Sequence, residues 1–173
     1  HPEPPPPRST SAPPMPPRPA TPRPKSSVRR HAGDTAMTPA QLASLHAACF
    51  TTPRPWSARE FATLLASPYT FVTGTPDAFA MGRVVAGEAE LLTIATAPAR
   101  RRNGLARTCL ARFDAMARDR DAEIAFLEVS AENHAAIALY TAAGWTERAR
   151  RADYYTAPDG RRIDARILGK VLA

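Results

Sequence analysis

Cysteine is scarce in this sequence, with only Cys49 and Cys109 among 173 residues. Each lies in a helical pattern of apolar neighbours, and neither has a histidine or a second cysteine at the spacing of a metal site or of a nucleophile and its base. A free cysteine in such surroundings behaves as a small apolar residue. We therefore expect two reduced, buried thiols, no metal and no covalent enzyme intermediate.

Long apolar runs are absent as well. No stretch approaches the roughly 18 residues that a membrane-spanning helix needs. No basic segment followed by an apolar one precedes the first expected helix. These two absences predict a soluble, cytoplasmic protein without a membrane partner.

Large apolar side chains are almost missing from residues 1–36. This segment instead holds 12 of the 19 prolines, six Lys or Arg and two acidic residues, which is +4 of the net charge of +7. Such a composition cannot offset the entropy cost of ordering, so we expect a disordered tail. Its Pro-x-x-Pro spacings suit a groove-binding peptide and its arginines suit RNA, but a solvated tail is the favoured interpretation.

The remaining residues, 37–173, form one domain's length of chain. Met37 directly precedes a helix-capping residue, Thr38, and has the position expected of a natural first residue. Without the tail, the domain carries only about +3, which is too little for a nucleic-acid-binding surface. We therefore expect no direct nucleic-acid partner.

Local signals predict four helices and six strands in this domain. Thr38 and Ser57 each begin a capping-box pattern, completed three residues later by Gln41 and Glu60. Gly144 stands where a helix would end in the left-handed conformation. The expected helices begin at 39, 58, 103 and 134, and the expected strands are 69–75, 78–87, 89–97, 124–129, 146–154 and 162–170.

The stretch Leu91–Ala106 carries the first functional signal. It is an apolar strand that ends in a basic turn, R-x-x-G-x-A, and then opens a helix. Small residues at Gly104 and Ala106 let main-chain N–H groups converge at the mouth of this loop. A helix N-terminus there adds a positive dipole, so the turn suits a pyrophosphate.

Four further motifs follow this loop at fixed distances: Leu127–Val129, Asn133, Tyr140 and Gly144-Trp145. The combination resembles the GNAT acetyltransferases, which bind acetyl-CoA. More narrowly, it resembles the RimI type, which acetylates protein N-terminal amines and was first known for alanine of ribosomal protein S18. The likeness runs from about Met37 to the C-terminus, and the order of elements is that of a GNAT core. It implies an α+β fold, a mostly antiparallel central sheet with helices on both faces.

The resemblance implies where acetyl-CoA binds. A strand that parts from its neighbour would hydrogen-bond the pantetheine arm, and one of its N–H groups would polarise the thioester carbonyl. Asn133 would contact the same arm while its side-chain oxygen caps a helix. The residues implied for cofactor binding are Ile94, Ala95 and Thr96 in the strand, Arg102, Asn103, Gly104, Leu105, Ala106 and Arg107 in the loop, and Asn133.

Glu128 is the acidic residue hardest to explain structurally, because its neighbours in the strand are apolar. A partly buried carboxylate has a raised pKa, which suits a general base. From spacing alone, a structural carboxylate paired with one of the many arginines is an equal alternative. The resemblance favours the base.

Tyr140 shares a helix face with Asn133 and Ile137. On pattern alone it is a core aromatic residue; the resemblance makes it the general acid beside the CoA sulfur. The late pair Tyr154-Tyr155 matches residues that border the peptide groove in RimI-type enzymes, and is otherwise an ordinary strand pair. His46 and His134 lack ligand partners in the sequence and are expected to be incidental.

The expected reaction is direct acetyl transfer from acetyl-CoA to the α-amine of a protein. Glu128 would accept the proton of the attacking amine and Tyr140 would protonate the departing thiolate, without a metal. The implied acceptor is the N-terminal alanine of ribosomal protein S18. Two alternatives remain: a GNAT enzyme acting on a lysine side chain or a small-molecule amine, and a CoA-binding or ribosome-assembly module without turnover.

Overall fold

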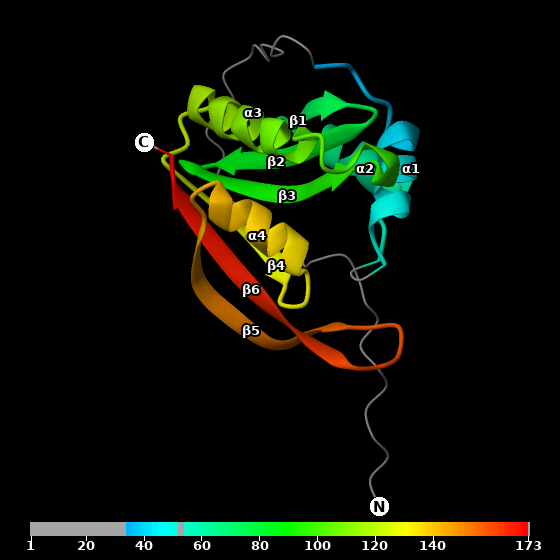
Figure 1. Cartoon of the computed structure of the whole chain (residues 1–173). Coiled ribbons are helices and arrows are strands. Elements are labelled where there is room, and N and C mark those ends of the chain that lie inside the picture. The colour runs from blue at the N-terminus through cyan, green and yellow to red at the C-terminus, as the bar shows by residue number, and fades with distance from the viewer. Residues whose placement is uncertain (1–33, 52–53, 173) are drawn as a thin grey trace, which may run out of the picture.

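The computed structural model describes residues 34–51 and 54–172. Figure 1 shows a curved sheet with helices on both sides and a long C-terminal hairpin. The helices are α1 (Pro39–Cys49), α2 (Ala58–Leu65), η1 (Pro98–Arg100, a short 3-10 turn), α3 (Leu105–Asp119) and α4 (His134–Ala142). The strands are β1 (Thr70–Thr75), β2 (Ala78–Val85), β3 (Glu88–Thr96), β4 (Ile124–Ser130), β5 (Thr146–Thr156) and β6 (Arg162–Val171).

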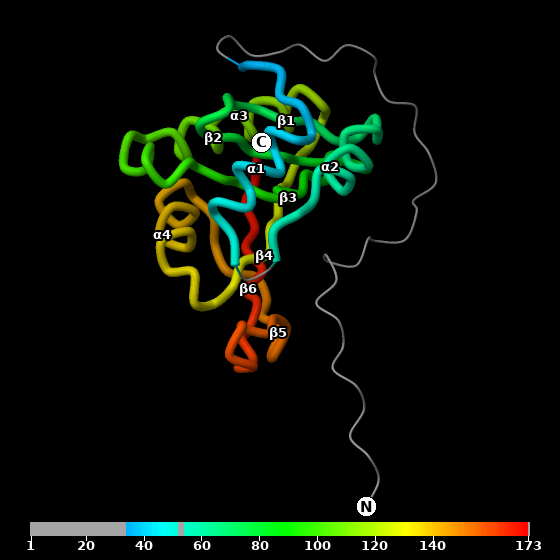
Figure 2. The backbone as a smooth tube through the Cα atoms, turned by 90° about the vertical axis from the view of Figure 1, so that its right-hand side faces the viewer, coloured from blue at the N-terminus to red at the C-terminus, as the bar shows by residue number. Residues whose placement is uncertain are grey.

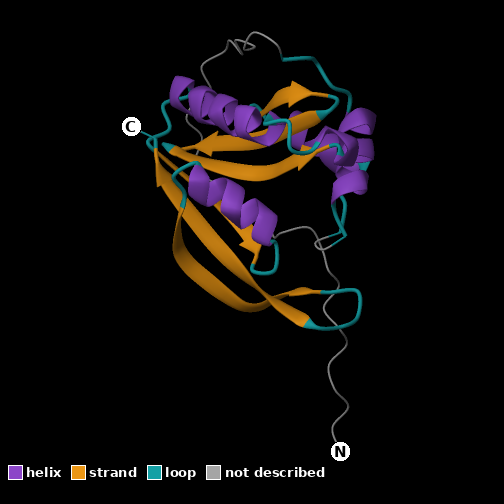
Figure 3. Ribbon diagram, in the orientation of Figure 1, coloured by secondary structure: helices purple, strands orange, loops and turns teal. Residues whose placement is uncertain are grey.

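The six strands form one sheet in the order β1-β2-β3-β4-β6-β5. All neighbouring strands are antiparallel except β3 and β4, which are parallel because α3 connects them. Figure 3 shows helices on the two sides of this sheet. The expected α+β class with a mostly antiparallel sheet is confirmed.

Two hydrophobic clusters, one on each face, hold the helices to the sheet. The larger joins α3 and α4 to the central strands and contains Phe113, Tyr140 and Trp145. The smaller joins α1 and α2 to β2 and β3 and contains Phe61 and Phe79. The contacts of α1 and α2 with the sheet thus centre on β1, β2 and β3.

The helix starts follow local capping chemistry. The Thr38 hydroxyl accepts the N–H of Gln41, whose side chain in turn accepts the N–H of Thr38, and Pro39 occupies the first helical position. Ser57 and Glu60 form the same reciprocal pair at α2. Both capping boxes predicted from the sequence are confirmed.

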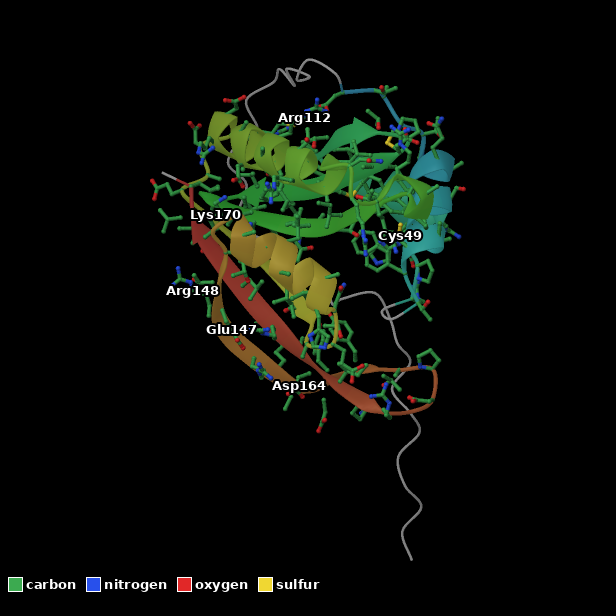
Figure 4. All side chains as sticks on the ribbon, viewed as in Figure 1. Cys49, Arg112, Glu147, Arg148, Asp164 and Lys170 are labelled. Atoms are coloured by element: carbon green, nitrogen blue, oxygen red, sulfur yellow. The ribbon has the colours of Figure 1, made fainter. Side chains whose placement is uncertain are left out.

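The residues just before 37, where the sequence places the start of the domain, already contact the domain. The carboxylate of Asp34 accepts hydrogen bonds from the N–H of Gly74, at 2.8 Å, and from the guanidinium of Arg112, at 2.9 Å. Thr35 N–H donates to the carbonyl of Gly74. These bonds attach the segment to the edge of β1 and to α3. Figure 2 shows the segment as the blue start of the coloured tube, and Figure 4 labels Arg112. The rest of the expected tail, 1–33, lies outside the described residues.

The parting of β3 from β4 is the feature that positions the site. The two strands pair only at Glu88–Glu90 with Ile124–Phe126. Beyond this point β3 pairs only with β2, and β4 pairs only with β6. An irregularity in the β2–β3 register leaves Leu92 as an extra residue where the strands separate, and such bulges bend a strand. We call the space between Leu91–Thr96 and Leu127–Ser130 the strand split.

Candidate active site

Glu128 lies on β4 beside the strand split, with 22% of its side chain exposed. Its strand neighbours Leu127 and Val129 point into the larger core cluster, so strand alternation turns Glu128 to the opposite face. A guanidinium nitrogen of Arg151 lies 3.2 Å from its Oε1, and the hydroxyl of Tyr154 donates a hydrogen bond to it. The carboxylate is therefore held at one position on the sheet.

Burial raises the pKa of the Glu128 carboxyl above its ordinary value, against the lowering effect of Arg151. The charge of Glu90 also raises this pKa, and the hydrogen bond from Tyr154 lowers it. The surroundings of Glu128 thus combine an ion pair with partial burial. The carboxylate is paired with an arginine, and its pKa is nevertheless raised.

Arg151 and Tyr154 reach Glu128 because β5 is irregular. The register between β5 and β6 shifts between Arg151 and Tyr155, and Asp153 within this bulge has a φ of +53°. Its N–H donates to the carboxylate of Asp164 on β6, at 3.0 Å. The bulge brings two tyrosines together, so that the Tyr154 and Tyr155 rings meet edge to face at 5.0 Å.

Tyr140 is almost completely buried on α4, with 6% of its surface exposed, and packs near Trp145. Burial raises the pKa of its hydroxyl far above the ordinary value, and the charge that Tyr155 would carry acts in the same direction. Tyr155 in turn interacts electrostatically with Glu128. The ionisation of Tyr155 is therefore coupled electrostatically to both Glu128 and Tyr140.

The strand Ile94–Thr96 forms the other side of the strand split. These residues pair with β2, from Ala80 opposite Ile94 to Ala78 opposite Thr96. Because β4 does not pair with them, their edge of β3 is open to an extended ligand. The geometry is that expected of a strand that hydrogen-bonds a ligand in place of its missing neighbour.

The loop before α3 contains two residues in the left-handed backbone conformation, one on each side of Asn103. Arg102 and Gly104 both have left-handed φ values, +66° and +73°. Gly104 is the N-cap of α3, and no side chain caps the helix there, so the amides of its first turn, Leu105, Ala106 and Arg107, are left to a ligand. Asn103 instead bonds the carbonyl of Arg100. Successive amides in such a turn make an anion-binding concavity.

Asn133 caps α4, as expected from the sequence. Its Oδ1 accepts the N–H of Ala136 at 3.2 Å, which leaves the amide nitrogen of the side chain for another contact. The residue is exposed at the β4–α4 turn, where β4 borders the strand split. His134, the next residue, is exposed on the first turn of the helix.

His46 and the two cysteines have structural surroundings. The Nδ1 atom of His46 accepts the N–H of Trp56, so Nε2 carries the proton and donates to Thr93, each at 3.0 Å. Cys109 is buried as expected, whereas Cys49 is only half buried and donates to the carbonyl of Thr96. Both thiols are free. Within 34–51 and 54–172, no three His, Cys, Asp or Glu residues gather in a possible metal site.

Sequence reasoning missed two charged residues near Glu128. Arg151 lies two strands away across β6, and Glu90 lies on β3. The many arginines suggested a partner for Glu128 but gave no means to choose among them. The one sequence feature that pointed to Arg151 was its position, in the pair Arg150-Arg151, shortly before the two tyrosines.

The family model described as the acetyltransferase (GNAT) family matches residues 38–145. The chain belongs to the GNAT acetyltransferase family. The matched range contains the strand split, the loop before α3, Glu128 and Tyr140. The C-terminal hairpin with Arg151 and the tyrosine pair lies beyond it.

Individual GNAT proteins extend the comparison. The [ribosomal protein bS18]-alanine N-acetyltransferase of Escherichia coli K12 is 39% identical over 111 residues, which cover 62% of this chain and 75% of that protein. The crystal structure of the ribosomal-protein-S18-alanine N-acetyltransferase from Escherichia coli matches with a TM-score of 0.72 and 32% identity, over 81% of this chain and 92% of that one. Arabidopsis thaliana NAA60 in complex with acetyl-CoA shares the fold, at 14% identity and a TM-score of 0.67, over 78% of this chain and 93% of that one.

None of the helices in the described part of this GNAT chain is both long and apolar enough to cross a membrane.

Proposed function

We propose that this protein transfers the acetyl group of acetyl-CoA to the N-terminal α-amine of a protein, with the N-terminal alanine of ribosomal protein S18 as acceptor. The observation that carries the proposal is the strand split, with the partly buried Glu128 at its edge. The 39% identical relative named for alanine acetylation of this ribosomal protein supports the acceptor. Such an acceptor implies a cytoplasmic enzyme.

The residues present fit acetyl-CoA. The open amides at the start of α3, between the basic side chains of Arg102 and Arg107, suit the pyrophosphate. The unpaired edge of Ile94–Thr96 suits the amide groups of the pantetheine arm, and the side-chain amide of Asn133 lies at the opposite border of the split. Acetyl-CoA, when bound, supplies the acetyl group as a thioester.

Glu128 acts as the general base. An α-amine has a pKa of about 7.7–8.0, so near neutral pH it is already partly unprotonated and needs only a modest base. The raised pKa of Glu128 brings its proton affinity closer to that of the amine. Glu128 accepts the proton, directly or through a water molecule, as the amine attacks the thioester carbonyl.

Tyr140 acts as the general acid. Its deep burial raises the pKa of the hydroxyl, so the group carries its proton at neutral pH. It protonates the CoA thiolate as the thioester breaks. The free thiols of Cys49 and Cys109 take no part, because the amine attacks the acetyl group directly.

Tyr154 and Tyr155 border the acceptor side of the site. Both are half buried on β5, and both interact with Glu128, so they surround the place where an acceptor amine meets its base. The alternative acceptor, a lysine side chain, has a pKa near 10.4, and at neutral pH a far smaller fraction of it is nucleophilic. This difference favours the α-amine.

A peptide panel tests the proposal. Peptides with a free N-terminal Ala, Ser or Met and one internal lysine are incubated with acetyl-CoA and enzyme, beside the same peptides with a blocked N-terminus. Mass spectrometry should find the acetyl group on the α-amine, with most turnover for alanine. Acetylation mainly of the lysine would establish the alternative enzyme, and no turnover with any amine would indicate a binding module.

A further inference from the structure

Glu128 is flanked by opposite charges on two strands. On β5, Arg151 contacts its carboxylate at 3.2 Å, with Tyr154 and Tyr155 beside it. From β3, the negative charge of Glu90 acts on the same carboxyl. β6, which lies between β4 and β5, places the apolar Ile167 opposite Glu128. Besides burial, which has the largest effect, a cation and an anion therefore act on the pKa of this carboxyl in opposite directions.

Arg151 is held in place although half of its side chain is exposed. Its guanidinium lies over the ring of Tyr154, 5.3 Å from the ring centre, while the other contact is with Glu128. The backbone bulge that carries both residues is fixed by the bond from Asp153 to Asp164. Arg151, Tyr154 and Glu128 thus form one contact group on the face of the sheet opposite α4.

Glu90 is fixed from the other side. It pairs with Arg83 of β2 at 2.5 Å, and 27% of its side chain is exposed. In the register of β3 and β4 it lies opposite Phe126, the last pair before the strands part. Phe126 and Glu128 share a face because strand side chains alternate. Glu90 is therefore on the same face as the base, at the closed end of the split.

We propose that Arg151 and Glu90 are opposed positioning residues for acetyl transfer. Arg151 holds the Glu128 carboxylate in place by direct contact, and Glu90 places a negative charge on the same face of the sheet, at the closed end of the split. Neither residue needs to touch a reacting atom. The proposal rests on the assignment of Glu128 as the base.

Two substitutions should move the titration of Glu128 in opposite directions. Removing the cation in Arg151→Gln should raise the midpoint by about one pH unit, the low end for an opposite charge within 4–6 Å. Removing the anion in Glu90→Gln should lower it by a smaller amount. Arg151→Lys, which keeps the charge, should restore a midpoint close to that of the unmodified protein.

Arg150→Gln is the matched control. Arg150 neighbours Arg151 on β5 but pairs with Glu147 and Asp164 instead, at 3.2 and 3.7 Å. Figure 4 labels these two acidic residues along the C-terminal hairpin. The Arg150→Gln substitution removes the same charge from the same strand as Arg151→Gln does, and it should leave the titration midpoint of Glu128 unchanged.

Two readouts separate this proposal from the proposed function. The first is the pH titration of the Glu128 side-chain carboxyl by carbon-13 NMR, with Glu128→Gln used to assign the signal; it requires no turnover. The second is the pH profile of kcat/KM below the titration of the acceptor amine at about 7.7–8.0, where the limb caused by Glu128 should shift with the NMR midpoint in each variant. In Arg151→Gln, the rate deficit should disappear above the new midpoint, whereas general structural damage would lower the rate at every pH.

An unchanged NMR midpoint in a folded Arg151→Gln protein would overturn the proposal, as would equal shifts for Arg150→Gln. If Arg151→Gln does not fold, Glu90→Gln decides the question, because its shift must be downward. If the midpoints move as stated while Glu128→Gln retains full activity, the charge pair is real and the assignment of the base is wrong.

Discussion

The imidazole of His46 on α1 and the hydroxyl of Thr93 on β3 form a buried hydrogen bond of 3.0 Å. The second ring nitrogen accepts the N–H of Trp56, and the ring stacks between Phe50 and Trp56. A histidine expected to be incidental therefore ties α1 and the segment before α2 to the strand that borders the split. Its role is structural and requires the neutral ring.

The stability of the fold should fall in mild acid because of His46. Burial lowers the pKa of this residue from 6.5 to about 4, so the unfolded chain binds the proton first as the pH falls. The loss therefore begins below about pH 6.5 and reaches roughly 2 kcal/mol at pH 5. Urea unfolding at pH 7.5 and 5 measures it. His46→Gln should reduce the pH dependence, and His134→Gln, at an exposed site, should not.

Gly104→Asp should weaken acetyl-CoA binding at least about tenfold, which corresponds to about 1.4 kcal/mol. A side chain at Gly104 would meet no atom within 4 Å, so the added group would lie in open space beside the amides of α3. Its negative charge would repel the pyrophosphate. Gly104→Asn has the same shape, tolerates the left-handed φ of this position, and should bind much better. Calorimetry that finds equal affinities would disprove the anion cradle.

Glu128→Gln should lower the rate near pH 7 by about 10²- to 10⁴-fold, the usual contribution of general base catalysis, while acetyl-CoA still binds. The defect should decrease as the pH rises and the acceptor amine loses its proton unaided. The control is Glu132→Gln, an exposed carboxylate paired with Arg161 near the same end of β4. Steady-state rates from pH 6 to 9 measure both, and a normal rate for Glu128→Gln at pH 7 would leave the residue a structural role only.

A chain that begins at Met37 should be less stable than one that begins at Ala32. The longer chain keeps Asp34, whose side chain is 6% exposed and bonds both Gly74 and Arg112. Loss of a buried charge-assisted pair costs about 1–3 kcal/mol, so the melting temperature should fall by several degrees. Asp34→Asn in the longer chain keeps an acceptor for Gly74 and should lose less. Equal melting temperatures for the two chain lengths would show that the Asp34 contacts contribute nothing.

The sequence predicted best what depends on neighbours within a few positions. The capping boxes of Thr38 and Ser57 and the N-cap of Asn133 are local, and each formed as predicted. The contacts around Glu128 are not local, because Arg151 reaches it across β6 and the bulge at Asp153 depends on Asp164. The attachment of Asp34 was missed for the same reason, since its partners are 40 and 78 residues away.

Because β3 and β4 pair over only a short stretch, the sheet consists of two parts, β1-β2-β3 and β4-β6-β5, joined by few hydrogen bonds. A ligand in the strand split would form the hydrogen bonds that β3 and β4 do not make with each other. The two parts of the sheet would then be held together by the bound molecule. Amide hydrogens of Ile94–Thr96 that face the opening would then exchange slowly only while that molecule is bound. Bound acetyl-CoA would thus occupy the place of a seventh strand, between β3 and β4, and would leave it after each turnover.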